Sequence, residues 1–203
     1  MYGGSLRLAT PKLGTEMDTA KPMRADARRN YERLVEEAKL AFGRHGVDAS
    51  LEDIARNAGV GIGTLYRHFP TREALLETLL RDRFDSQAAT ARQLLDAPSP
   101  VDALRTWLLD IGRTSARYRG LSESMMTALT DETSRLYASC HAMQAGLSHL
   151  VERARDAGQL REDVTTQELL LLAHAVAWAS EHVGTENAVD RLFDLVFDGL
   201  RVS

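Results

Sequence analysis

Cysteine, proline and long apolar runs are all scarce in this chain of 203 residues. Its one cysteine, Cys140, excludes an intramolecular disulfide framework and a cysteine-rich zinc site. Five prolines and 14 glycines are too few for a collagen-like or low-complexity chain. No apolar run approaches the roughly 18 residues of a membrane helix, and residues 1–22 lack the apolar segment of a secretory signal. These absences predict a soluble, cytoplasmic, globular protein.

The net charge of −4 argues against a generic nucleic-acid binder, but the charge is unevenly distributed. Residues 21–83 hold 12 Lys and Arg against 10 Asp and Glu, whereas residues 84–203 hold 11 against 17. A mildly basic N-terminal part and an acidic C-terminal part are expected if only the N-terminal part binds an anion.

Apolar residues recur at helical spacing along most of the chain, which predicts an all-α protein. Residues 1–22 show no periodicity and are interpreted as a disordered arm, followed by a first helix over about 25–44. After residue 22 the pattern divides the chain into an N-terminal helical domain at 23–70, a connecting helix at 71–96 and a C-terminal helical domain at 97–203. The Pro-rich stretch at 97–100 separates the last two, and helices are expected near 101–111, 121–129, 136–158, 169–183 and 189–200.

Two short helices joined by a tight turn are expected at residues 50–68. Ser50 followed by Asp53 resembles a helix-capping box, and Gly59 ends the first short helix. Ala55 and Ala58 are small enough to lie where two helices cross. The second short helix carries polar residues, and a helix of this kind fits the major groove of DNA.

The residues of this unit resemble the DNA-binding signature of TetR-type transcriptional regulators. The resemblance rests on Leu51-Glu-Asp-Ile-Ala55 followed by Ala58-Gly-Val-Gly-Ile-Gly-Thr-Leu-Tyr-Arg-His-Phe69 and covers about residues 26–84. It implies a dimeric regulator, most often a repressor, that binds a palindromic operator and is released by a small-molecule ligand. An activator of the same family is the alternative, since the direction of control depends on where the operator lies.

The resemblance also implies roles in DNA contact. Thr64 would meet a phosphate or base edge, and Tyr66 and His68 would place polar atoms on phosphates. Arg72, at the start of the next helix, would bind the phosphate backbone of DNA. The full set of expected DNA contacts is Arg28, Arg29, Ser50, Gly61, Ile62, Thr64, Tyr66, Arg67, His68 and Arg72.

Two residues of the recognition helix depart from the family pattern. Gly61 stands where Ser or Thr is usual, and Ile62 stands where a polar residue often touches bases. Ile62 cannot donate to guanine but could pack on a thymine methyl group. Structural alternatives stay open as well: Tyr66 and His68 could be core residues, and Arg28 and Arg29 could belong to a solvated helix start.

The resemblance implies a small-molecule pocket among the C-terminal helices, with an apolar or amphipathic ligand. Plain core packing is the alternative for each candidate, and His174 fits a hydrogen-bonded core histidine. The candidates are Trp107, Ile111, Met125, Met126, Met143, Leu147, His174 and Trp178.

The last two helices carry more apolar surface than one small bundle needs, and a two-fold operator requires two recognition helices. We therefore expect a homodimer through about residues 167–183 and 188–201, in a four-helix arrangement, with packing within one chain as the alternative. The expected interface residues are Leu170, Ala173, Ala177, Val189, Leu192, Phe193, Val196 and Leu200.

Other functions have less support. His141 and His149, like His174 and His182, are eight residues apart rather than four, which argues against a helical metal site. Cys140 could be a redox sensor, but a buried inert thiol fits its surroundings better. No P-loop, dinucleotide-binding glycine pattern or Gly-Xaa-Ser-Xaa-Gly elbow is present. No cofactor is therefore expected, and an enzyme, a helical small-molecule-binding protein and an architectural DNA binder are the weaker alternatives.

Overall fold

The computed structural model describes residues 20–115, 132, 135–183 and 187–200, and its regular elements are helices. This confirms the all-α prediction. The elements are α1 (Ala20–His45), the short 3-10 helix η1 (Gly46–Asp48), α2 (Leu51–Asn57), α3 (Ile62–His68), α4 (Arg72–Leu94), α5 (Pro100–Ser115), α7 (Arg135–Asp156), α8 (Thr166–Val183) and α9 (Ala188–Leu200).

The boundaries agree with the sequence pattern except at the start of α1. This helix begins at Ala20 rather than near residue 25, so the end of the expected arm is helical. Pro22 lies in the first turn, where its missing N–H would have no partner in any case. Residues 1–19 and the helix expected at 121–129 lie outside the described residues.

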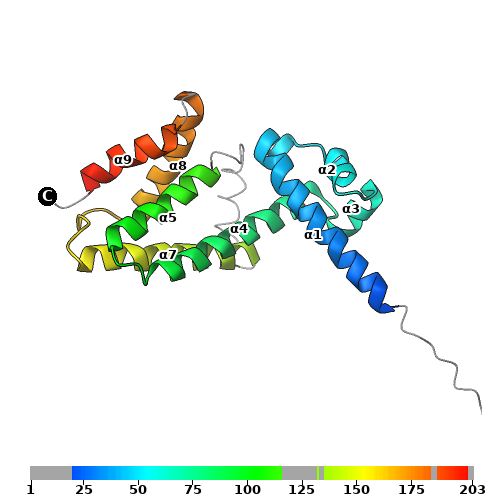
Figure 1. The fold of residues 1–203 in the computed structure, drawn as a ribbon, viewed down its shortest axis with the longest axis horizontal. Helices are drawn as coiled ribbons and strands as arrows, with labels where there is room; N and C mark the ends of the chain where they lie inside the picture. Colours follow the sequence, from blue (N-terminus) through cyan, green and yellow to red (C-terminus); the bar gives the residue numbers. More distant parts are fainter. Residues whose placement is uncertain (1–19, 116–131, 133–134, 184–186, 201–203) are drawn as a thin grey trace, which may run out of the picture.

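The chain forms a head and a body that share one long helix (Figure 1). Helices α1, α2 and α3 cluster as the head, and α5, α7, α8 and α9 make up the body. Helix α4 leaves the head and continues along α7 into the body, where these two helices form the most extensive helix–helix contact.

Two left-handed glycines end the helices of the head. Gly46 follows α1 with a φ of +64°, and Gly59 follows α2 with a φ of +70°. Both glycines fit positions where a side chain would be strained. The sharp turns fold α2 and α3 back onto α1, so that Leu34, Ile54 and Leu65 meet in one buried core.

Close helix contacts hold the body together. A Cβ on Gly146 of α7 would lie 2.7 Å from the Ala91 Cβ of α4, so the two backbones approach more closely than larger side chains allow. Gly112 of α5 serves the same purpose, because a Cβ there would lie 2.5 Å from the Phe193 ring of α9. Ion pairs Arg105–Asp194 and Arg113–Asp190 also join α5 to α9.

Candidate nucleic-acid interface

The ends of the helices in the head are fixed by local hydrogen bonds. The Asp53 N–H donates to Ser50 Oγ at 3.1 Å, which caps α2 as the sequence predicts. The Ala74 N–H donates to Thr71 Oγ1 at 3.1 Å and caps α4 in the same way. Gly61 caps α3 without a side-chain bond. Helix α3 is instead held by Leu65, which is completely buried, and by Phe69 at its C-cap.

Helix α3 presents one face to solvent. Gly63, Tyr66 and Arg67 are exposed, and because they are three and four residues apart they share that face. Tyr66 keeps 45% of its surface exposed although it is a large aromatic residue. Thr64 and His68 are half-buried at the margins of the face. Four of the expected DNA contacts, Thr64, Tyr66, Arg67 and His68, therefore lie together on or beside one surface of the head.

An aromatic cluster supports the end of α3. One of its members, Tyr31, was not among the residues predicted from the sequence. The Tyr31 ring of α1 meets the His68 ring edge-on, with centroids 5.9 Å apart, and lies 5.3 Å from the Phe69 ring. Tyr31 therefore positions the imidazole of His68. Its spacing of three and four residues before the buried Leu34 and Val35 would have placed it on the inner face of α1.

Arg72 has a structural contact in addition to its expected role on phosphate. Its Nη1 donates to the Ala49 carbonyl, just before α2, and the side chain is half-buried. The arginine thus joins the start of α4 to the start of α2. Ser50 is similarly engaged, as the cap of α2.

The two arginines of α1 take part in exposed ion pairs. Arg28 Nε donates to Glu32 at 2.8 Å, and Arg29 pairs with Asp26. Such exposed pairs contribute little to stability, so both guanidinium groups are available to exchange their carboxylates for phosphates. Ile62 is half-buried and packs against the core of the head.

This head, with an exposed helix seated on a glycine turn and carrying Tyr66 and Arg67 outward, defines a helix-turn-helix DNA-binding protein. Residues 34–79 match the N-terminal model of the bacterial regulatory proteins of the tetR family, and residues 99–202 match the C-terminal domain model of SbtR-like transcriptional regulators. The chain belongs to the TetR family of DNA-binding transcriptional regulators. This is a family of regulators rather than enzymes, which confirms the prediction of a non-enzymatic protein.

Solved structures with the same fold match this chain over most of its length. The TetR regulator SCO0520 of Streptomyces coelicolor is 32% identical, with a TM-score of 0.64, and the match covers 85% of this chain and 98% of that one. A TetR regulatory protein of Mycobacterium vanbaalenii is 34% identical at a TM-score of 0.64, with 89% and 100% covered. The HTH-type transcriptional regulator SAUSA300_2515 of Staphylococcus aureus is 36% identical over 75 residues, 36% of this chain and only 40% of that relative.

The structure separates the expected pocket residues. Trp107, Ile111, Met143 and Leu147 are buried in the body, whereas Trp178 is 66% exposed and stacks on His182, with ring centroids 4.3 Å apart. Met125 and Met126 lie outside the described residues. The structure thus does not bring Trp178 together with the buried candidates.

His174 is a largely buried histidine of α8. Its Nδ1 lies 2.7 Å from the carbonyl oxygen of Leu170, one turn earlier in the same helix. Burial lowers the pKa of the imidazole, and the positive charge of Arg83 acts in the same direction. The hydrogen bond to the Leu170 carbonyl acts in the opposite direction but does not reverse the shift, so the charged form of the ring is disfavoured.

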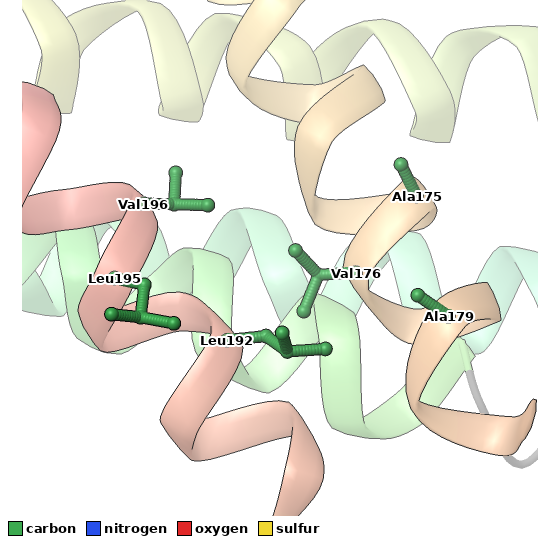
Figure 2. A pocket seen from close by; sticks show the side chains of 6 residues that line it. All are labelled: Ala175, Val176, Ala179, Leu192, Leu195 and Val196. Carbon is green, nitrogen blue, oxygen red and sulfur yellow. The ribbon is translucent and has the colours of Figure 1, made fainter. Parts of the chain in front are cut away.

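An apolar groove lies elsewhere, between α8 and α9, and Figure 2 shows its walls. Its volume is about 360 Å³. None of the expected ligand contacts lines it, but two of the expected interface residues do, Leu192 and Val196. Its lining residues are Ala175, Val176, Ala179, Leu192, Leu195 and Val196.

The expected interface residues divide into two groups. Ala173, Ala177 and Phe193 are buried inside the single chain, so they belong to its own core in this structure. The other five, Leu170, Val189, Leu192, Val196 and Leu200, are half-buried and pack beside that core.

Neither a metal cluster nor a membrane-spanning helix is found within the described part of the chain. No three His, Cys, Asp or Glu side chains gather there in a way that could hold a metal ion. None of the helices described is both long and apolar enough to cross a bilayer.

Cys140 is a buried thiol. It is 1% exposed, and burial raises the pKa of the thiol from 9.0 to about 11. We expect its reaction with a thiol reagent at pH 8 to be at least about 100-fold slower in the folded protein than in urea, because about 100-fold less thiolate is present. The same pKa shift predicts a pH effect on stability. The thiol of the unfolded chain loses its proton at a lower pH than the folded one, so the free energy of unfolding should fall as pH rises from 9 to 11. This part of the fall should be absent in Cys140→Ala. Rapid labelling of the folded protein would contradict this assignment.

Tyr66 offers a test of phosphate contact. Tyr66→Phe keeps the ring and removes only the hydroxyl, so we expect about 5–10-fold weaker binding to specific and random-sequence DNA alike. Fluorescence anisotropy with both duplexes measures the change. A loss confined to the specific duplex would instead place the hydroxyl on a base.

Proposed function

We propose that this protein is a ligand-responsive repressor that binds a palindromic operator as a homodimer and is released by a small apolar or amphipathic ligand. The observation that carries the proposal is the uncovered apolar surface of α8 and α9, at the end of a chain whose head is a DNA-binding unit. We assign residues 23–70 to DNA binding, 71–96 to the connecting helix, and 97–203 to ligand binding and dimerisation.

A second copy of the chain is the occupant that best fits this surface. Leu171, Leu172, Trp178 and Leu195, four of the six exposed large hydrophobic side chains among the described residues, lie on α8 and α9. Leu195 lines the apolar groove, and Leu171, Leu172 and Trp178 lie on α8, the helix that forms its other wall. Exposed apolar surface of this kind marks a protein–protein contact. Two heads related by a two-fold axis would then read half-sites about 34 Å apart.

The proposed interface therefore keeps Leu192 from the expected set and adds exposed residues next to it on α8 and α9. It uses the outer faces of the two helices, at Leu171, Ala175, Trp178, Leu192 and Leu195. Ala173, Ala177 and Phe193 support those helices from behind.

A ligand site in the body is supported by polar atoms within its apolar interior. Gln87 is 4% exposed, and its Oε1 has no hydrogen-bond partner among the described residues, while its Nε2 donates to Asp110. His174 is a second polar group of the body, and burial disfavours its charged form. A few polar groups within apolar walls are typical of small-molecule pockets. Such a ligand would release DNA by binding more tightly to the conformation in which the heads no longer fit the operator.

In the proposed DNA complex the side chains act in two ways. Arg28, Arg29, Tyr66, His68 and Arg72 would hold phosphates, which position the protein without reading sequence. Thr64, Ile62 and Arg67 would meet base edges, Ile62 through a thymine methyl group. Because its target is chromosomal DNA, the protein would act in the cytoplasm.

Selection of random double-stranded DNA on the purified protein, followed by a salt titration of the winning duplex, tests the proposal. We expect a near-palindromic sequence, a dissociation constant of about 10⁻⁸–10⁻¹¹ M, and an affinity that falls steeply with salt as counterions are released. Thermal shifts with a library of apolar and amphipathic compounds test the ligand. No enrichment, even after refolding the protein free of bound small molecules, would overturn the proposed operator recognition.

A further inference from the structure

We infer that Gly63 determines how closely the recognition helix approaches DNA. The backbone at this position, which no side chain covers, packs against base edges in the major groove. The inference goes beyond DNA binding itself because it assigns specificity to a residue without a side chain. The relevant partner is double-stranded DNA.

Nothing in the described part of the chain requires a glycine at position 63. The glycines with a positive φ among the described residues are Gly46, Gly59 and Gly158, and Gly63 is not one of them. A Cβ added to Gly63 would meet no atom of the described residues within 4 Å, in contrast to Gly112 and Gly146, where neighbouring atoms lie at 2.5 and 2.7 Å. Gly112 and Gly146 thus serve close packing within the protein, whereas the space beside Gly63 is open.

A glycine at this point also weakens the helix that contains it. Glycine is the least favourable helix residue after proline, and α3 has only seven residues with which to compensate. Gly61, which caps the same helix, contributes no side-chain hydrogen bond. The fold thus tolerates a destabilising residue at a place where alanine would fit.

Position 63 lies at the centre of the surface that faces away from the protein. It precedes Tyr66 by three residues and Arg67 by four, so these two exposed side chains stand on either side of it one turn later. Leu65 points in the opposite direction and is completely buried. A side chain at position 63 would therefore point away from the head, on the same face as Tyr66 and Arg67.

Ile62 cannot take over this position. It is half-buried and packs against the core of the head, so its side chain points partly inward. At the start of α3 the exposed residues are thus Gly61 and Gly63, which have no side chain to cover their backbone. Glycine permits such a surface to come into direct contact with a ligand, and a methyl group at position 63 would hold the helix away from the groove.

The test compares Gly63→Ala with wild type on two duplexes, the winner of the wild-type selection and a scrambled sequence of equal length. We expect affinity for the winner to fall by roughly tenfold, at the scale of one lost base contact, with a much smaller change on the scrambled duplex. The melting temperature should rise by about 2–4 °C, because alanine favours the helix. Binding and stability would then change in opposite directions.

Two further variants separate the effect of side-chain size on binding from the effect of helix propensity on stability. Gly63→Ser adds a side chain with less helix propensity, so it should lose affinity as Gly63→Ala does, without an equal gain in melting temperature. Gly43→Ala is the matched control, because a Cβ on Gly43 of α1 also meets nothing within 4 Å. It should raise the melting temperature and leave both affinities unchanged.

The inference is overturned if Gly63→Ala raises the melting temperature and binds the winning duplex as tightly as wild type. It is also overturned if the loss is equal on both duplexes, since the backbone would then not meet base edges. Failure of the wild type to select any sequence would count against the proposed operator recognition, and that outcome is distinct from either of these.

Discussion

Leu195→Asp should convert the protein into a monomer and lower its affinity for the palindromic duplex by about 100-fold or more. Leu195 is 64% exposed on α9 and lines the apolar groove with α8. A carboxylate there would have to be buried without a partner when a second copy covers the groove, which is costly. Loss of the dimer also removes the gain of binding two linked half-sites. Analytical ultracentrifugation and anisotropy titrations measure the two effects.

Leu40→Asp is the matched control for this variant. Leu40 is another exposed leucine, but it lies on α1, away from α8 and α9. It should leave the sedimentation coefficient unchanged. A dimeric Leu195→Asp protein with unchanged operator affinity would show that α8 and α9 do not form the dimer interface.

Trp107→Ala should cost about 3–5 kcal/mol of unfolding free energy, the range measured for large aromatic residues truncated in a core. Trp107 is completely buried, and its Nε1 donates to the Gln87 carbonyl of α4 at 2.9 Å. The substitution leaves a cavity between α4 and α5 and removes that hydrogen bond. Urea denaturation followed by circular dichroism measures the loss.

Trp107→Phe separates packing from hydrogen bonding. The phenyl ring fills much of the space but cannot donate to Gln87, so we expect a smaller loss of about 1–3 kcal/mol. A loss of less than about 1 kcal/mol for Trp107→Ala would contradict the tight packing of this side chain in the body.

The head was predictable because its signals are local. Ser50, Gly59, Leu65 and Phe69 lie within twenty residues of one another, and each acts on its neighbours through a cap, a turn or the small core they share. Helix periodicity and turn chemistry therefore predicted α2, the turn and α3 correctly. Tyr31 was overlooked because its contact with His68 joins residues 37 positions apart, and helical spacing alone does not identify its partner.

The body was harder to predict because α8 and α9 are apolar on more than one side. Periodicity identified apolar positions such as Ala173 and Phe193, but both are buried in the chain's own core, Phe193 against Gly112 of α5. The exposed positions, Trp178 and Leu195, are equally apolar in the sequence. Only the packed structure distinguishes the face that the chain covers itself from the face left open.

Because α4 is one continuous helix, a tilt of this helix within the body displaces its other end in the head. Helix α4 starts beside the recognition unit at Arg72 and meets Gly146 of α7 at Ala91, 19 residues later, about 28 Å away along the axis. If α4 pivots about this contact, a tilt of the helix axis by about 5° moves the start of α4 by about 2.5 Å. That displacement approaches the rise of a single base pair. In the proposed dimer, a small rearrangement in the body would therefore be enough to misalign the two heads with their half-sites.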